Sequence, residues 1–183
     1  MYTRLLILPI FAVTILTLSS CSVFKFAKIY TSSDPGSGEL HGDVYKTELT
    51  SYRIGNLGNN WKRVKIEYGD LFFANSNKTS AITVNSSCGP NKANYSLSAL
   101  SGSLLVGLKG KELIDRELVV IDGEEALFSV YDAEFEGDDL KIATAVFKKG
   151  QCVYDFSYSN INDDFDTYLE EFVKFLSEFR VLG

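Results

Sequence analysis

The chain has 183 residues, of which 45% are hydrophobic and 23% charged, and its 24 acidic and 18 basic residues give a formal net charge of −6. A chain of this length can bury the core of one domain. Its acidity argues against binding to nucleic acid and against direct electrostatic attachment to anionic lipid, because both need an excess of basic residues.

The first 20 residues have the pattern of an export signal. A single basic residue, Arg4, precedes an apolar run from Leu5 to Leu18, and small residues follow this run. The run covers 14 residues, whereas a transmembrane helix needs about 20. Residues 1–20 are therefore predicted to be a signal peptide, and their removal would take Arg4 away and leave a net charge of −7.

The quartet Leu18-Ser19-Ser20-Cys21 resembles the lipobox of bacterial lipoproteins. The resemblance implies that the Cys21 thiol receives a diacylglyceryl group and that a peptidase then cuts just before it. The alternative is an ordinary signal peptide with an incidental cysteine. Because one buried acyl chain binds a membrane only marginally, stable anchoring takes at least two, and a lipoprotein cysteine carries two or three.

The resemblance also predicts a location. The mature chain is expected in the cell envelope, anchored to a membrane by its lipid and facing the periplasm. Ser22 stands where an Asp would retain a lipoprotein in the inner membrane of enterobacteria. The outer membrane is therefore favoured over the inner one.

Residues 21–49 are predicted to be the lipidated N-terminus and a flexible tether, because a Ser-, Gly- and Pro-rich stretch follows residue 30. A single globular domain is predicted for residues 50–183. Its first half alternates apolar and polar residues in short runs, which predicts strands over residues 51–54, 64–68, 71–74 and 81–84. Ser96 then has the position of a helix N-cap, and the leucines after it predict a helix to about Lys109.

Four strand-like runs follow, separated by short turns rich in Asp, Gly and Lys; they cover residues 117–121, 126–135, 140–148 and 152–159. Such turns predict hairpins, so these runs should form an antiparallel meander. Asn162 can cap a last helix with an apolar stripe that packs on the sheet: Phe165, Tyr168, Leu169, Phe172, Leu176 and Phe179.

Two cysteines remain after Cys21, namely Cys88 and Cys152. An exported domain rarely keeps two idle thiols, so a disulfide between them is predicted, with two separate buried thiols as the alternative. No metal site is expected, because the only histidine, His41, lies in the polar tether and no second cysteine lies close in sequence to either thiol.

The order of these elements, together with the positions of Trp61, Cys88 and Cys152, resembles the PsbP-like fold. The resemblance covers residues 51–182. It implies an α+β domain in which an antiparallel sheet of about six to seven strands is flanked by helices, as an α/β/α sandwich. Members of this fold mostly act by binding partners, and the fold has no common set of catalytic residues to carry over.

Catalytic chemistry has little support in the sequence. Ser101 lies within the predicted helix, without the Gly-X-Ser-X-Gly turn that exposes a nucleophile. The acidic residues 134–139 lack the spacing of a calcium loop and are predicted to form a hairpin turn. No catalytic residue and no cofactor is therefore assigned.

Three functions remain open. The first is a non-catalytic envelope lipoprotein that binds or assembles with another envelope protein. The alternative is a carrier or sensor of a small apolar ligand or peptide, for which the 13 Phe and 10 Tyr residues would have to line an open cavity. A hydrolase is the least favoured, since the folded part lacks a general base other than carboxylates.

Overall fold

The computed structural model describes residues 38–66, 69–161 and 164–183. The predicted signal peptide, Cys21 and residues 22–37 of the predicted tether lie outside these ranges. So do Tyr68 and Asn162, for which the sequence predicts a strand and a helix cap. Within the described ranges, no helix has the length and apolarity to cross a membrane.

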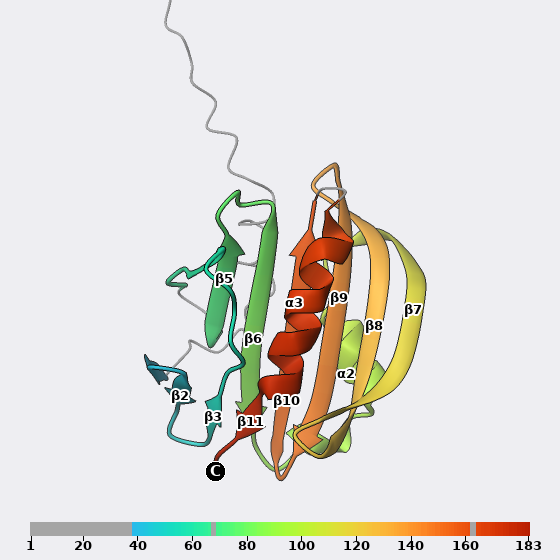
Figure 1. The fold of residues 1–183 in the computed structure, drawn as a ribbon. Coiled ribbons are helices and arrows are strands. Elements are labelled where there is room, and N and C mark those ends of the chain that lie inside the picture. The colour runs from blue at the N-terminus through green and yellow to red at the C-terminus, as the bar shows by residue number, and fades with distance from the viewer. Residues whose placement is uncertain (1–37, 67–68, 162–163) are drawn as a thin grey trace, which may run out of the picture.

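An antiparallel sheet of seven strands forms the centre of the described fold (Figure 1). In spatial order its strands are β4 (Trp61–Arg63), β5 (Leu71–Asn75), β6 (Ser80–Cys88), β10 (Cys152–Asn160), β9 (Asp138–Lys149), β8 (Glu124–Phe135) and β7 (Lys109–Ile121). The predicted meander is confirmed as β7 to β10, although β7 begins at Lys109 and not near residue 117. Because β10 pairs with β6, two segments far apart in sequence become neighbours at the centre of the sheet.

The predicted strand over residues 64–68 is wrong for residues 64–66, the part of it that the structure describes. Strand β4 ends at Arg63. Only the Val64 N–H continues the pairing, by donating to the Phe72 carbonyl over 2.9 Å. The apolar and polar alternation instead lets Val64 and Ile66 pack against the cluster of Phe72, Ala74 and Ala81 outside a regular ladder.

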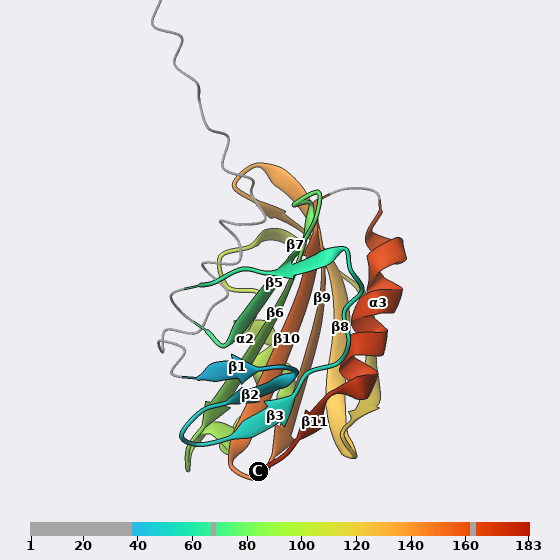
Figure 2. The same ribbon diagram turned by 60° about the vertical axis from the view of Figure 1, so that its left-hand side comes forward.

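A second sheet has four strands among the described residues (Figure 2). In order they are β1 (Glu39–His41), β2 (Val44–Lys46), β3 (Ser51–Arg53) and β11 (Arg180–Val181). The prediction of a tether up to residue 49 is therefore wrong for residues 39–46. The physical reason is Tyr45, which is 1% exposed and packs its ring 5.3 Å from that of Tyr52, so that this polar stretch still contributes to the core.

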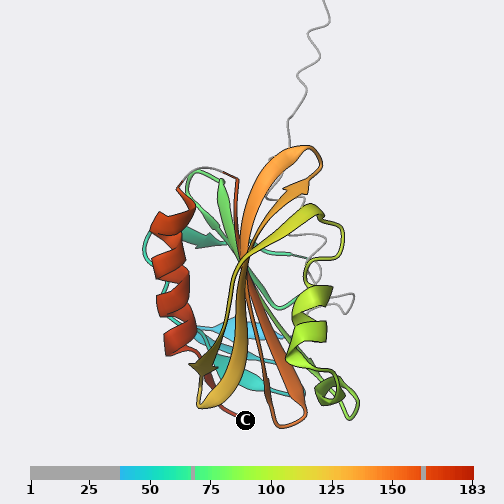
Figure 3. The same ribbon diagram turned by 90° about the vertical axis from the view of Figure 1, so that its right-hand side faces the viewer.

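The two faces of the large sheet are covered differently (Figure 3). Helix α3 (Phe165–Glu178) and the small sheet cover one face, called the α3 face, over an aromatic core. Phe179, at the end of α3, lies 4.9 Å from Phe156 and 5.0 Å from Tyr52 between ring centroids. The stripe predicted from the sequence is thus largely buried, with Phe175 as an additional fully buried member.

The opposite face, called the α2 face, is covered by α2 (Leu97–Ser103) and lies next to the 3-10 helix η1 (Lys92–Asn94). Ser96 caps α2 as predicted, since its side chain accepts a hydrogen bond from the Ala99 N–H over 3.1 Å. The helix ends at Ser103 and not near Lys109. Gly107 adopts a φ of 90°, which favours glycine, and turns the chain into β7, while Leu105 and Leu108 fill the space against β8 and β9.

Candidate functional site

A disulfide connects the two central strands at one end of the large sheet. Cys88 is the last residue of β6 and Cys152 the first of β10, and the two stand directly opposite each other in the antiparallel register. Their sulfur atoms are bonded, and their Cα atoms lie 4.0 Å apart. The structure therefore brings together the two cysteines that the sequence analysis paired, across a separation of 64 residues.

A hollow of about 660 Å³ lies beside this disulfide and is called the disulfide hollow. Residues from distant parts of the chain line it: Leu49, Thr50, Cys88, Gly89, Pro90, Lys149, Gly150, Gln151, Cys152, Tyr154, Val181, Leu182 and Gly183. Two of its leucines are unusually open, because Leu49 is 71% exposed and Leu182 is 48% exposed. The volume falls within the range of about 300–1,000 Å³ that is typical of small-molecule sites.

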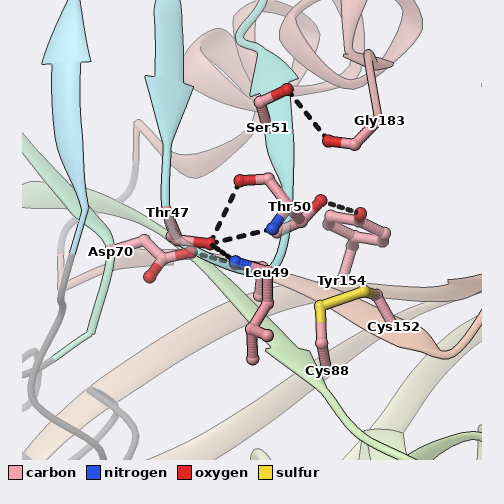
Figure 4. Close-up of a disulfide and its surroundings, with 10 residues drawn as sticks. Thr47, Leu49, Thr50, Ser51, Asp70, Cys88, Cys152, Tyr154 and Gly183 are labelled. Atoms are coloured by element: carbon pink, nitrogen blue, oxygen red, sulfur yellow. Dashed lines mark hydrogen bonds between the residues drawn. A yellow bond between two sulfur atoms is a disulfide. The ribbon is translucent and has the colours of Figure 1, made fainter.

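A tight turn between β2 and β3 holds Leu49 at the rim of the hollow (Figure 4). The Thr47 hydroxyl accepts hydrogen bonds from the N–H groups of Leu49, over 3.1 Å, and Thr50, over 3.0 Å. It also donates to the Thr50 carbonyl over 3.0 Å. Behind the turn, the hydroxyls of Thr50 and Tyr154 share a buried hydrogen bond of 2.6 Å. The turn is thereby fixed to β10 next to the disulfide.

The last residues of the chain form the opposite wall. The Leu182 N–H donates to the Ser51 carbonyl over 2.8 Å, and the Ser51 N–H and hydroxyl both donate to the Gly183 carbonyl, over 2.6 and 2.9 Å. These bonds hold β11 and the residues after it against β3. The apolar side chains of Val181 and Leu182 consequently line the hollow.

Asp122, in the turn between β7 and β8, joins three elements near this wall. Its carboxylate accepts hydrogen bonds from Lys149 Nζ over 2.6 Å and from the Val181 N–H over 3.0 Å, and Arg180 Nε lies 3.8 Å away. Burial alone would raise the pKa of this carboxyl, but the bonds from Lys149 and Val181 and the nearby cations outweigh it and lower the pKa. The ammonium of Lys149, which lines the hollow, is therefore paired.

Two other hollows are more polar in their lining. One of about 490 Å³ lies between the small sheet and β4, where Trp61 and Ile54 meet Arg53, Arg63 and Glu178. Trp61 is held there by a 2.6 Å bond from its indole nitrogen to Glu171. Another of about 430 Å³ lies at the start of α3 and is bordered by Asp132, Asp139, Asp166 and Lys141. Neither has the open leucines of the disulfide hollow.

The residues that the sequence analysis considered for catalysis or metal binding do not lie together. Ser101 is fully buried on α2 and faces Thr144 with 3.5 Å between their hydroxyl oxygens. His41 lies in β1 with an exposed side chain 3.3 Å from Glu39. The acidic residues 134–139 span the predicted hairpin turn between β8 and β9. In the described ranges, no group of three or more His, Cys, Asp or Glu side chains could hold a metal ion.

Asp155 is an acid with a strongly shifted pKa. Burial on the α2 face of β10 is the main cause, and the nearby Asp70 adds to it; a 2.8 Å hydrogen bond from Asn85 opposes the shift, and the pKa rises to about 7. A carboxyl with such a pKa can serve as an acid or a base. Neither Asp155 nor Asp70 lines any of the hollows described above. We therefore interpret the raised pKa of Asp155 as the cost to stability of burying this carboxylate.

Replacing Asp155 with asparagine is expected to raise the free energy of unfolding by about 2 kcal/mol at pH 8. In the unfolded chain this carboxyl ionises near pH 4, whereas in the fold it ionises near pH 7. Between about pH 4 and pH 7 the folded wild-type protein therefore binds one more proton than the unfolded chain does. Its stability consequently falls as the pH rises through this range.

Urea denaturation of Asp155→Asn across this pH range measures the effect, with Asp166→Asn, on the exposed side of α3, as the matched control. The difference between Asp155→Asn and the wild type should grow between pH 4 and pH 7 and stay constant above. An equal difference at pH 4 and pH 8 would rule out a raised pKa.

Sequence reasoning found part of this site and missed the rest. The paired cysteines were found because an exported domain favours a disulfide. Leu49 and Leu182 were missed, since the first lay in the predicted tether and the second follows the last helix. Asp122 was recognised only as a turn residue, because its partners Lys149 and Val181 come close only through the tertiary fold.

The chain matches no known family model and no curated protein sequence. Solved structures do resemble it. LpqN of Mycobacterium tuberculosis, described as involved in cell envelope biogenesis, has a TM-score of 0.59 at 13% sequence identity, over 80% of this chain and 90% of LpqN. The cyanobacterial PsbP protein CyanoP of Synechocystis sp. PCC 6803 has a TM-score of 0.53 at 16% identity, over 82% of this chain and 96% of CyanoP. Identities this low establish the fold alone, and the chain has the PsbP-like α+β fold.

Proposed function

We propose that this protein is a lipid-anchored lipoprotein of the cell envelope that works by binding another envelope component and not by catalysis. The observation that carries the proposal is the quartet Leu18-Ser19-Ser20-Cys21 after an apolar run, which assigns Cys21 as the lipid attachment site. Support comes from the fold shared with LpqN, a protein of envelope biogenesis. Ser22 favours the outer membrane, with the domain facing the periplasm.

The linker to the domain allows this arrangement. Sixteen residues separate Cys21 from Gly38, the first residue of the described structure. A fully extended chain of that length reaches about 55 Å. The domain can therefore meet a partner at the membrane surface or at some distance from it, and the lipid increases its local concentration there.

The disulfide hollow is the binding surface that we assign to this function. Its rim offers Leu49 and Leu182 to a partner, while its back wall is fixed by the disulfide and by the bond between Thr50 and Tyr154. Exposed apolar side chains on a rigid support are typical of interaction sites. An apolar segment of an envelope protein is the occupant that fits best.

Two comparisons test the proposal. Intact-mass analysis of protein from native membranes should show acyl groups on a chain that begins at Cys21; an unmodified residue 21 would remove the lipoprotein assignment. A pull-down from solubilised envelopes should then recover the same partner with the acylated protein and with Cys21→Ser. Loss of the partner only with Cys21→Ser would mean that membrane placement, and not the domain, carries recognition.

A substitution in the hollow is expected to weaken binding strongly. Leu49→Asp places a charge at the apolar rim, and we expect recovery of the partner to fall at least tenfold, since burying an unpaired carboxylate in an interface is costly. The matched control is Val173→Asp on α3, where Val173 is 48% exposed and lines none of the hollows described. Equal recovery with both variants would place the binding surface elsewhere.

The hollow also supports a second function, the carriage of a small apolar ligand. Its volume of about 660 Å³ suits such a molecule. Mass spectrometry of protein purified under native conditions would then detect a co-purified ligand that is lost in Leu49→Asp. Detection of such a ligand, without a protein partner in the pull-down, would favour the carrier over the assembly module.

A further inference from the structure

Strand β7 forms one edge of the large sheet, and Figure 1 shows no described strand beyond it. It covers 13 residues, and all of them except Val119 and Ile121 are exposed. A long, exposed edge strand with apolar side chains is a template for pairing with another chain. Four large apolar side chains of β7 are open to solvent: Leu113 is 46% exposed, Ile114 50%, Leu118 60% and Val120 74%.

The two halves of β7 differ in how well they resist such pairing. The first half has two irregularities in its register with β8, one before Glu112 and one before Asp115. Bulges and lysines commonly protect an edge, and Lys109 and Lys111 also lie in this half. Residues 115–121 instead pair with β8 without interruption. This second half is therefore the part of the edge that a further strand can extend.

The turn at the end of β7 determines which backbone groups point outward. Asp122 and Gly123 form a two-residue turn with φ angles of 51° and 81°. The residue pair beside such a turn exchanges both of its hydrogen bonds, and bonded and non-bonded pairs then alternate along the strands. Every second residue back from Ile121 therefore bonds to β8. The N–H and C=O groups of Leu118 and Val120 consequently point away from the sheet.

Arg116 agrees with this direction, because it precedes Leu118 by two residues and should also point its N–H outward. That N–H donates to the Asp115 carboxylate over 2.8 Å, so it is bonded on the outer side. Since no described strand lies beyond β7, the outward groups of Leu118 and Val120 are open to a partner.

The side chains of this half are apolar on the α2 face. Ile121 packs into the core beneath α3. Because successive side chains of a strand project to opposite faces, Val120 and Leu118 project on the α2 face. Arg116 lies on that face as well, but its guanidinium is directed at β8, where it donates to the Tyr131 hydroxyl. The outer edge of this face is therefore formed by the two apolar side chains.

The α3 face of the same edge is acidic. Asp115 and Glu117 stand opposite two residues of β8 that belong to the core beneath α3, namely Val130 and Phe128. Directly opposite residues project from the same face of a sheet, so both carboxylates lie on the α3 face. Among the residues that the structure describes, neither carboxylate has a cation within ion-pair distance. A partner strand can supply that positive charge.

We propose that the second half of β7 binds an extended segment of a partner protein, which adds antiparallel to β7 as a further strand. Apolar residues of this segment lie beside Leu118 and Val120, and its lysines or arginines lie beside Asp115 and Glu117. Because the side-chain period of a strand is two, the segment alternates apolar and basic residues. No residue of β7 lines the disulfide hollow, so this edge is a second interaction surface, beyond the function proposed above.

A second copy of this chain fits the edge less well. Antiparallel pairing of two β7 strands about residue 116 or 117 places Arg116 or Glu117 opposite its own copy, and like charges directly opposite are destabilising. Pairing about Leu118 or Val119 places the Glu117 carboxylate opposite an apolar residue, without a cation. A segment with basic residues at these positions neutralises the carboxylates instead.

Peptide binding tests the edge with the mature protein. The probe is a fluorescent peptide of sequence Lys-Val-Lys-Val-Lys-Val-Lys, and its control has the same residues in block order, Lys-Lys-Lys-Lys-Val-Val-Val. In anisotropy titrations at low salt, we expect the control to bind at least tenfold more weakly, since only alternation places the two kinds of side chain on opposite faces. Equal binding of both peptides would show attraction by overall charge and would overturn the proposal.

Backbone methylation of the probe tests the pairing without altering the protein. The valines share a face with Leu118 and Val120, so in an antiparallel pair their N–H groups point at β7 and those of the lysines point away. Methylation of the valine nitrogens is expected to weaken binding at least tenfold. Methylation of an equal number of lysine nitrogens should have little effect. Equal losses from both patterns would remove the assigned edge.

Variants of the protein test whether the probe binds at β7. Val120→Pro removes an outward N–H and keeps the bonds to β8, and we expect it to weaken binding at least tenfold. The pair Asp115→Asn and Glu117→Gln should weaken it about fivefold, because exposed cross-strand charge pairs contribute modestly. The matched pair Glu39→Gln and Glu48→Gln removes the same charge from exposed positions near the small sheet and should change nothing. Unchanged binding in both β7 variants would contradict the proposal.

Two further measurements separate this edge from the other surfaces. Leu49→Asp should leave probe binding unchanged, whatever it does to recovery of an envelope partner; loss of probe binding in this variant would place the peptide in the disulfide hollow. Sedimentation of the protein alone should show a monomer. A dimer that Val120→Pro dissociates would assign the edge to a second copy and would overturn the proposal of a partner segment.

Discussion

Replacement of both Cys88 and Cys152 with serine is expected to lower the free energy of unfolding by about 4 kcal/mol. The bond connects residues that are 64 positions apart, and without it the unfolded chain gains the conformational freedom of that loop. β6 and β10 would keep their pairing, because residues 80–88 and 152–160 are in register over the whole length of both strands. Urea denaturation of the mature protein measures the loss.

Reduction of the wild-type protein provides the matched control. A thiol reductant should lower the denaturation midpoint of the wild type to that of the Cys88→Ser, Cys152→Ser variant, and it should leave the variant unchanged. The two single variants should resemble the double variant, because either one removes the bond. A wild type that is unaffected by reductant and as stable as the double variant would show that the two thiols are separate.

Loss of this bond should also affect binding at the disulfide hollow. Cys88 and Cys152 line its wall together with Tyr154, and the turn that carries Leu49 is fixed to Tyr154 through Thr50. A looser end of β6 and β10 would allow the two sides of the hollow to move apart. The double variant is therefore expected to recover less partner even under conditions where it is fully folded.

The local sequence predicted the elements whose signals are short-range. The turns Asp122-Gly123, Gly137-Asp138 and Lys149-Gly150 separate the strands of the meander, and β7 to β10 follow them. The apolar stripe of α3 likewise predicted its buried side, because residues three and four apart share a helix face. The fold class followed from the order of these elements.

Elements that depend on distant contacts were not predictable in the same way. β1 and β2 have three residues each, too few for a periodic pattern. They belong to the domain because β2 pairs with β3 and because Tyr45 packs on Tyr52. The disulfide hollow combines the β2–β3 turn, both cysteines, the β9–β10 turn and the chain after β11. No local pattern marks a site assembled from four separate segments.

Asp122→Ala is expected to destabilise the protein by about 3 kcal/mol, the second large effect. The Asp122 side chain is 11% exposed and that of Lys149 33% exposed, so removal of the carboxylate leaves a half-buried ammonium without its partner. The Val181 N–H loses its acceptor as well, which loosens β11 and the wall of the hollow. Asp122 also has a φ of 51°, a conformation that alanine adopts less readily than aspartate or asparagine.

The variant Asp122→Asn separates the charge from the backbone effect, because asparagine tolerates this conformation and still offers an acceptor to Val181. Asp122→Asn should therefore lose only part of the stability that Asp122→Ala loses. Since the fold lowers the pKa of Asp122, the stability that its charge contributes is present above the pKa of the unfolded chain, near 4, and is lost as the pH falls through the lower pKa of the fold. The difference between wild type and Asp122→Asn should therefore shrink as the pH is lowered below about 4. A difference that is the same at pH 2 and pH 7 would show that the pairing with Lys149 contributes nothing, and that Asp122 acts through its turn alone.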